Sequence, residues 1–187
     1  MKLALRSVFA FALPLSLASA TEALHSPDGK IAVEFEVRAA DGVAVYRVRR
    51  GSQTVLRDSQ LGLIRDDADF SRQLRRISSA PVTNVEDRYE LLTGKRRLNF
   101  YRANRQVHHL ATADGRKLDV EFQVSNDGVA FRYVFPDISA EPRTIAEERS
   151  SFSFPSGTKA WLQPMSVAKT GWKNTNPSYE EHYQREI

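Results

Sequence analysis

The stretch Leu118–Phe135 reads LDVEFQVSNDGVAFRYVF. Apolar residues occupy every second position on both sides of a central turn, so each half presents one apolar face, as a half-buried β-strand does. The turn is Asn126-Asp127-Gly128, and all three residue types tolerate left-handed backbone. The stretch therefore predicts an antiparallel hairpin, with Phe122, Phe131 and Tyr133 in the core between two sheets.

The N-terminal half of the chain repeats this pattern. Residues Ile31–Val37 alternate apolar side chains with Glu34 and Glu36, and the turn 39–42 leads into a second β-rich run that ends at Arg50. After the turn Gly51-Ser52-Gln53, two short strands are expected, and the polar residues Asp58-Ser59-Gln60 separate them. These two strands are Thr54–Leu56 and Leu61–Ile64.

The remaining segments also favour strands. A hairpin is expected to run from Val85 through the turn Gly94-Lys95 to Arg102, and short strands are expected at Phe152–Phe154 and Lys159–Leu162. The segment Arg65–Asn84 has no sustained period and is interpreted as a long connection or an irregular edge. No segment has a sustained 3.6-residue period, so the sequence predicts an all-β, two-sheet antiparallel β-sandwich.

The first twenty residues have the pattern of a secretory signal. Lys2 and Arg6 precede an apolar run from Val8 to Leu17, and Ala18-Ser19-Ala20 offers a small-residue cleavage site. The run is shorter than the roughly 18 residues that a membrane span needs. The alternative is a buried helix of the mature fold. The signal interpretation gives a signal peptide at 1–20, one domain at 21–187, a periplasmic or secreted location, and no membrane segment after cleavage.

Composition limits the stability and the partners of this domain. The chain has no cysteine, so buried apolar area rather than disulfides must stabilise it. Removing Lys2 and Arg6 lowers the formal net charge from +4 to +2, and no dense basic block is interleaved with aromatic residues. Nucleic acid is therefore not expected as a partner.

Few residues form a recognisable chemical motif. His108 and His109 are adjacent and on a strand would point to opposite faces, so they are interpreted as surface or packing residues rather than joint metal ligands. The tail has more side chains that could bind a ligand, since Pro177–Tyr183 places two carboxylates and an imidazole between two tyrosines. Aromatic and polar groups together are typical of a sugar site. The alternative is a solvated loop whose tyrosines pack on the sandwich.

Four segments, taken in order, resemble the N-terminal domain of glycoside hydrolase family 97. They are Ser26–Lys30, Gln60–Leu63, the hairpin from Phe122 to Tyr133, and Ser178–Tyr183. The resemblance implies a supersandwich of the galactose-mutarotase type, followed in complete members by a (β/α)8 barrel and a small C-terminal β domain. Such members cleave α-linked glucosides or galactosides, by inversion or retention, with catalytic carboxylates on the barrel.

The chain stops at Ile187 without that barrel, so the resemblance assigns no catalytic residue here and implies a chain that is inactive alone. We expect it to be part of a larger enzyme, whose α-linked oligosaccharide substrate is bound through the barrel. The competing hypothesis is a free-standing periplasmic carbohydrate-binding or structural sandwich without catalysis.

The resemblance also implies one metal ligand. In the family, a glutamate of the N-terminal domain helps barrel glutamates to bind Ca²⁺, and the matching residue is Glu180, with Glu181 as the alternative. Calcium takes six to eight oxygen ligands, so this loop could supply only part of a site. Weak or absent calcium binding is therefore expected for the chain alone, and the alternative is that Glu180 is simply solvated.

Overall fold

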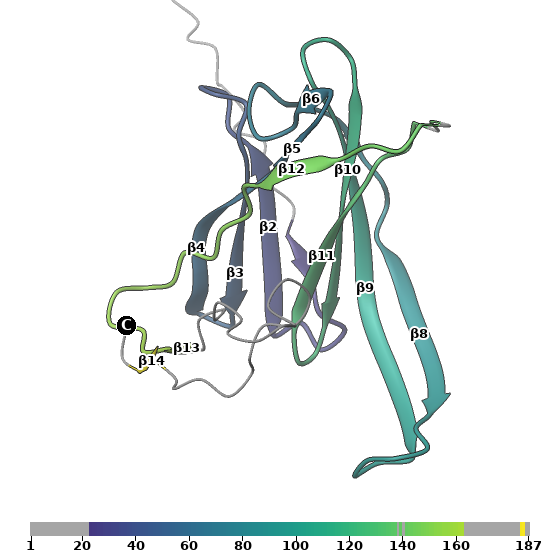
Figure 1. The fold of residues 1–187 in the computed structure, drawn as a ribbon. Coiled ribbons are helices and arrows are strands. Elements are labelled where there is room, and N and C mark those ends of the chain that lie inside the picture. The colour runs from purple at the N-terminus through teal and green to yellow at the C-terminus, as the bar shows by residue number, and fades with distance from the viewer. Residues whose placement is uncertain (1–22, 138, 140, 163–183, 186–187) are drawn as a thin grey trace, which may run out of the picture.

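The computed structural model describes residues 23–137, 139, 141–162 and 184–185. This part of the chain contains strands and no helix (Figure 1), and therefore no helix that could cross a membrane. The expected signal peptide at 1–20 lies outside the described residues. The strands are β1 (Leu24–His25), β2 (Ile31–Val37), β3 (Ala44–Arg50), β4 (Gln53–Leu61), β5 (Leu63–Arg65), β6 (Ala68–Asp69), β7 (Arg75–Ser79), β8 (Thr83–Glu90), β9 (Leu98–Ala111), β10 (Lys117–Ser125), β11 (Val129–Val134), β12 (Ile145–Glu148), β13 (Trp161–Leu162) and β14 (Gln184–Arg185).

The first sheet is an antiparallel meander in the order β1-β2-β3-β4. The alternation that predicted β2 and β3 is confirmed, since Ile31, Val33 and Phe35 are all buried. The prediction of two short strands at 54–64 is wrong in its first part, because β4 runs unbroken through the polar residues. Ser59 is fully buried there, and its hydroxyl donates to the Arg57 carbonyl at 2.8 Å and accepts the Ser153 amide at 2.9 Å.

The second sheet has the order β11-β10-β9-β7, and β8 also pairs with β9. Strand β9 is 14 residues long, and β7 pairs with its second half while β8 pairs with its first. The predicted hairpins β8–β9 and β10–β11 are confirmed. The segment 65–84 is not one long connection, since it contains β6, β7 and the start of β8. The alternative, an irregular edge, describes β7, which lies at the edge of the second sheet and has a register shift between Arg76 and Ser78.

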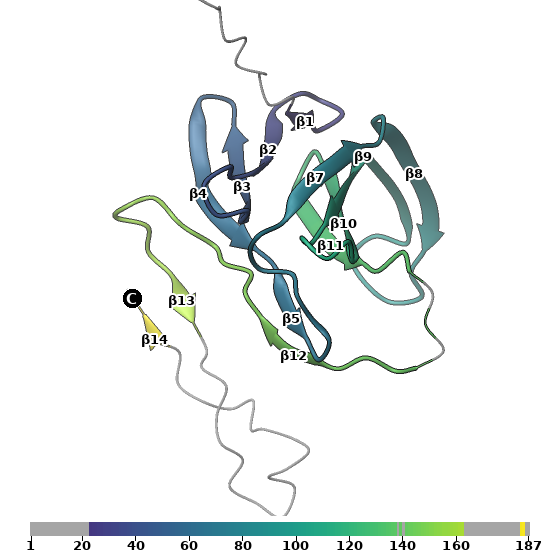
Figure 2. The ribbon, with the colours of Figure 1, turned by 90° about the horizontal axis from the view of Figure 1, so that it is seen from above.

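The two sheets face each other (Figure 2), and their apolar faces form one core. Phe122 of β10 is fully buried and lies 5.7 Å from Phe35 and 5.8 Å from Tyr46, measured between ring centroids. Phe131 and Tyr133 are only partly buried, so their predicted place in the core is at its margin. The Tyr133 hydroxyl accepts the Gly62 amide at 2.8 Å and hydrogen bonds to Ser150 at 2.6 Å. These bonds hold β11 against segments near β5.

Two small sheets complete the fold: β12-β5-β6, and β13 with β14. The strand expected at Lys159–Leu162 is present as the shorter β13. The strand expected at 152–154 is absent. That segment instead follows β4 through two isolated backbone bonds, from the Ser151 amide to the Gln60 carbonyl and from the Arg57 amide to the Ser153 carbonyl. Phe152 and Phe154 are therefore largely exposed there.

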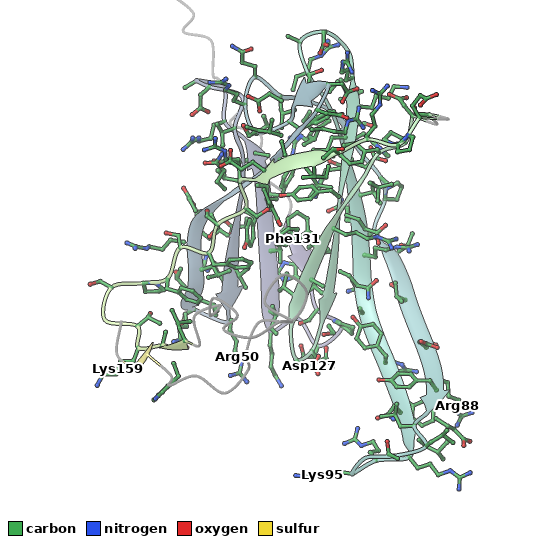
Figure 3. All side chains as sticks on the ribbon, in the orientation of Figure 1. Arg50, Arg88, Lys95, Asp127, Phe131 and Lys159 are labelled. Carbon is green, nitrogen blue, oxygen red and sulfur yellow. The ribbon has the colours of Figure 1, made fainter. Side chains whose placement is uncertain are left out.

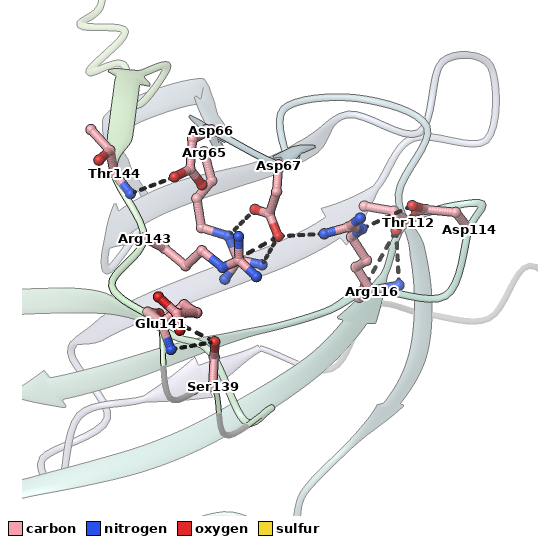
Figure 4. Close-up of polar contacts among 10 residues, drawn as sticks. All are labelled: Arg65, Asp66, Asp67, Thr112, Asp114, Arg116, Ser139, Glu141, Arg143 and Thr144. Atoms are coloured by element: carbon pink, nitrogen blue, oxygen red, sulfur yellow. Dashed lines mark hydrogen bonds and ion pairs between the residues drawn. The ribbon is translucent and has the colours of Figure 1, made fainter.

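A polar cluster joins three connections at one end of the sandwich (Figure 4). Arg65 donates to both carboxylate oxygens of Asp67, at 2.5 and 3.1 Å, and Arg116 and Arg143 form ion pairs with the same group. The hydrogen bond from Arg65, helped by the charges of the three arginines, lowers the pKa of Asp67 despite some desolvation. The Arg65 guanidinium also lies 4.5 Å from the Phe135 ring centroid. The cluster therefore fixes the β5–β6, β9–β10 and β11–β12 connections to one another.

Candidate docking surface

The β8–β9 hairpin extends past the sandwich, at the bottom of Figure 1. We call residues 83–102 the arm, and we call the end of the sandwich beside it the lower end, which contains the turns 26–30, 51–52 and 126–128. Asn104 donates a hydrogen bond from its side chain to the carbonyl of His25 in β1, at 2.8 Å. This contact ties β9 to the first sheet just above the arm.

The core-facing side of β9 continues along the arm. Side chains alternate along a strand, so Leu98 and Phe100 lie on the same face as the buried residues His108 and Leu110. Leu98 is nevertheless 50% exposed and Phe100 is 64% exposed. Leu98 and Phe100 therefore place two large apolar side chains on this face outside the core, and Arg102 and Asn104 lie between them and the buried residues.

Charged side chains of β8 share this face, because Arg88 lies opposite Phe100 and Glu90 lies opposite Leu98 in the hairpin. The Arg88 guanidinium lies 4.3 Å from the Phe100 ring centroid, and Arg102 pairs with Glu86 at 3.0 Å. At the tip, Leu92 is completely exposed. A two-stranded hairpin alone is only marginally stable in water. Several large apolar side chains exposed on one projecting hairpin favour a contact role for the arm.

An apolar groove opens at the lower end of the sandwich itself. It has a volume of about 550 Å³ and is bounded by the ends of β2, β3 and β4 and by the β10–β11 turn. Its floor includes Ile31, Val48 and Leu56, while Arg50 and Asp127 lie at its polar rim (Figure 3). Ser125 donates to the Asp127 carboxylate at 2.5 Å, which fixes the turn on that side.

Strand β13 adds exposed aromatic surface beside the same end (Figure 1), where Trp161 is 68% exposed and Leu162 is 50% exposed. The arm, the groove and β13 together form what we call the docking surface. Its apolar residues with large exposed fractions are Val55, Tyr89, Leu91, Leu92, Leu98, Phe100, Trp161 and Leu162. Charged residues such as Arg88 and Lys95 lie among them, and aromatic residues such as Phe100 and Trp161 are enriched at protein–protein contacts.

The two adjacent histidines have packing roles, as predicted. His108 is buried, stacks on Phe35 at 4.3 Å, and shares a 2.8 Å hydrogen bond between its Nδ1 atom and Ser79. Burial, with a smaller effect from the charge of Arg76, lowers the pKa of His108 to about 4. His109 faces the other way and pairs with Asp119 at 2.8 Å.

The predicted metal ligands fall outside the part of the chain that the structure describes. This holds for Glu180, for its alternative Glu181, and for the aromatic tail around them. Within the described ranges, no group of three or more His, Asp or Glu side chains could hold a metal ion.

The docking surface was not predicted from the sequence. One signal could have indicated it, because Leu91 and Leu92 lie next to the turn Gly94-Lys95, where hairpins normally carry polar residues. Apolar residues at a hairpin tip suggest that the tip is covered by something else.

The two facing antiparallel sheets define a β-sandwich domain. The chain belongs to the family described as Glycosyl-hydrolase 97 N-terminal, whose model matches residues 24–187. It is 35% identical over 128 residues to a probable retaining alpha-galactosidase of Streptomyces bingchenggensis (strain BCW-1). That match covers 68% of this chain and 20% of the relative.

Solved structures agree with this assignment. A beta-arabinopyranosidase crystal structure is 35% identical, with a TM-score of 0.78 over 87% of this chain and 26% of its own. A glycoside hydrolase family 97 enzyme from Pseudoalteromonas sp. strain K8, in complex with panose, shares the fold at 20% identity and a TM-score of 0.73. That match covers 88% of this chain and 24% of the enzyme. The chain thus spans about a fifth to a quarter of the length of these relatives.

Proposed function

We propose that this chain is the N-terminal β-sandwich domain of an exported α-glycosidase, that it docks onto a catalytic domain through the docking surface, and that it is inactive alone. The observation that carries the proposal is the exposure of two large apolar side chains on the projecting arm, Leu98 and Phe100. The α-galactosidase and the other relatives are four to five times longer than the matched region, which supports a catalytic domain as the occupant of that surface.

The substrate of the complete enzyme, in this proposal, is an α-linked oligosaccharide bound mainly by the catalytic domain. Support comes from the relatives, which include the panose complex and another complex of a family 97 enzyme from the same strain with acarbose. The sandwich adds Glu180, which supplies one carboxylate to a calcium site whose other ligands belong to the catalytic domain. The pattern at residues 1–20 supports export to the periplasm or the medium.

A chimaera tests the role of Glu180. The matched N-terminal segment of the Streptomyces α-galactosidase is replaced by this chain, and hydrolysis of nitrophenyl α-galactoside is measured against free calcium. We expect Glu180→Gln to raise the calcium concentration for half-maximal activity by about tenfold, because one of six to eight oxygen ligands loses its charge. The control Glu181→Gln should shift it less than twofold.

Equal shifts in the two variants would contradict the assignment to Glu180. The unjoined chain provides a second measurement. Its calorimetric titration with calcium should show no binding tighter than roughly millimolar. Micromolar affinity, or hydrolysis by the unjoined chain, would refute its role as a part of a larger enzyme.

The docking surface is tested by placing charge on the arm. Leu98→Asp together with Phe100→Asp should leave the unfolding of the unjoined chain nearly unchanged, within about 1 kcal/mol, because both side chains are exposed. In the chimaera, the same pair should lower the thermal midpoint or split the transition, because the charges would be buried against the catalytic domain. Calorimetry of both forms measures the difference.

The matched control is Ile77→Asp on β7, where the side chain is 55% exposed and lies away from the arm. It should change neither the unjoined chain nor the chimaera by more than the same small amount. An arm variant whose chimaera unfolds like the control would rule out docking through the arm.

A further inference from the structure

The outer edge of β8 has no strand beside it in the part of the chain that the structure describes (Figure 2). On the inner side, the Leu91 amide donates to the carbonyl of Arg97, which lies directly opposite, at 2.9 Å. Opposed residues of an antiparallel pair alternate between bonded and non-bonded pairs, so Tyr89, Asp87 and Val85 also bond to β9. The residues between them point their backbone N–H and C=O groups away from β9, toward the open edge. They are Asn84, Glu86, Arg88 and Glu90.

An open strand edge can pair with another chain, and proteins commonly block such edges with proline or a bulge. The edge next to β8 is blocked in this way, because β7 has a register shift between Arg76 and Ser78 and is followed by Pro81. Strand β8 has neither feature, since its eight residues include no proline and pair with β9 in one unbroken register. The edge from Thr83 to Glu90 can therefore accept a second strand.

The sequence of β8 is complementary to itself when two copies run antiparallel with Asp87 at the two-fold axis. Glu86 of one copy then lies opposite Arg88 of the other, and the reverse pair forms on the far side of the axis. Both residues point their backbone groups outward, so they can exchange hydrogen bonds across the new pair. On the other face of the sheet, Val85 lies opposite Tyr89, and a β-branched residue opposite an aromatic one favours strand pairing.

Charge selects this register over its neighbours. An axis at Glu86 would place that carboxylate opposite its own copy, and an axis at Arg88 would place two guanidiniums opposite each other. With the axis at Asp87, the Oε1 atom of Glu86 keeps its 3.0 Å ion pair with Arg102 of its own chain. The second oxygen of Glu86 can then accept a hydrogen bond from Arg88 of the second copy. The unfavourable contact is at Asp87, whose carboxylate faces its own copy across the axis.

We propose that two copies of this chain associate through the outer edges of β8, antiparallel about Asp87. The pairing converts two projecting two-stranded hairpins into one four-stranded sheet of order β9-β8-β8-β9, which is more stable than either hairpin alone. Continued past the strand ends, the same register places the completely exposed Leu92 near Val82 of the second copy, which is 46% exposed. The edge is distinct from the arm face at Leu98 and Phe100, so the inference does not rest on the proposed docking function.

Sedimentation equilibrium of the purified chain, at concentrations up to about 1 mM, should show monomers in equilibrium with dimers. Glu86→Arg alone or Arg88→Glu alone should weaken the dimer at least about fivefold, because each places like charges opposite one another twice. Asp87→Asn should strengthen it by about twofold to fivefold, because the repulsion at the axis is removed. The control Lys95→Glu changes the net charge as much as Arg88→Glu does, lies in the turn at the arm tip, and should alter the dimer less than about twofold.

Mixing the two weakened variants tests the register directly. Both opposed pairs then carry opposite charges, so Glu86→Arg chains and Arg88→Glu chains should form a mixed dimer about as tight as the wild-type one. Mixing would not repair a folding defect in either variant. A chain that stays monomeric at every concentration, a mixture that does not associate, or single variants that dimerise like Lys95→Glu would overturn the pairing. A dimer of the unjoined chain that is absent from the chimaera would assign the edge to the catalytic domain and overturn a second copy as its occupant.

Discussion

Phe122→Ala is expected to destabilise the chain by about 3 to 5 kcal/mol, much of the stability of a typical domain. The side chain is fully buried, and its ring contacts those of Phe35, Tyr46 and Phe131 at centroid distances of 5.7 to 6.1 Å. Truncation would leave a cavity between both sheets, since aromatic rings from separate strands cannot all move to fill it. Urea denaturation followed by circular dichroism measures the loss.

Two further truncations calibrate that result. Phe131→Ala should cost less than Phe122→Ala, because Phe131 packs at the margin of the core and is only partly buried. Phe152→Ala should cost less than about 1 kcal/mol, because its side chain is 58% exposed. A Phe122→Ala midpoint close to that of Phe152→Ala would show that the assigned strand phase is wrong.

The hairpins could be predicted because their decisive information is local. In β10, four buried side chains alternate with polar ones, and the turn chemistry at Asn126 to Gly128 fixes where the chain reverses. A one-residue change of phase would place Phe122 in water and Glu121 in the core. The sequence therefore predicts both the strand and the face it buries, without knowledge of its partners.

Elsewhere the decisive partner is distant in sequence. The polar Ser59 suggests a break in β4, yet its side chain is fully buried. Burial is tolerated because the amide of Ser153, 94 residues away, donates a hydrogen bond to its hydroxyl. Strand β7 has no apolar alternation because all five of its residues are exposed, and its pairing depends on the unusual length of β9. Hydrophobic periodicity cannot predict a strand whose pairing buries no side chain.

The candidate site was harder still to predict. Leu98 and Phe100 follow the same alternation as core residues. They are exposed because β9 continues past Asn104, where it contacts β1 of the first sheet. The close approach between Gly42 and Gln73 joins two segments that are distant in sequence, and no local pattern reveals it. Glu180 came from the family resemblance alone, and its role as a calcium ligand stays a prediction.

Acidification below neutral pH should destabilise the chain, and His108 is the reason. Its pKa falls from an ordinary 6.5 to about 4 in the folded protein, because burial disfavours the charged imidazole and Arg76 repels it. Below pH 6.5 the unfolded chain therefore binds a proton that the folded chain does not. Stability is highest above pH 6.5 and falls as the pH drops toward 4, by about 2 kcal/mol between pH 7 and pH 4.5.

Urea denaturation at pH 7, 5.5 and 4.5 measures this loss, and His108→Leu isolates its source. The variant has no imidazole at that position, so its stability should change little over the same range, although it also loses the hydrogen bond to Ser79 at every pH. The aspartates with lowered pKa values, such as Asp67 and Asp69, destabilise the fold only below their ordinary value of 3.8. The control His109→Gln removes the neighbouring imidazole, which faces away from the core, and should reduce the wild-type slope only slightly, because His109 has the smallest of the effects that lower the pKa of His108. A wild-type chain that is equally stable at pH 7 and pH 4.5 would contradict the buried, neutral state of His108.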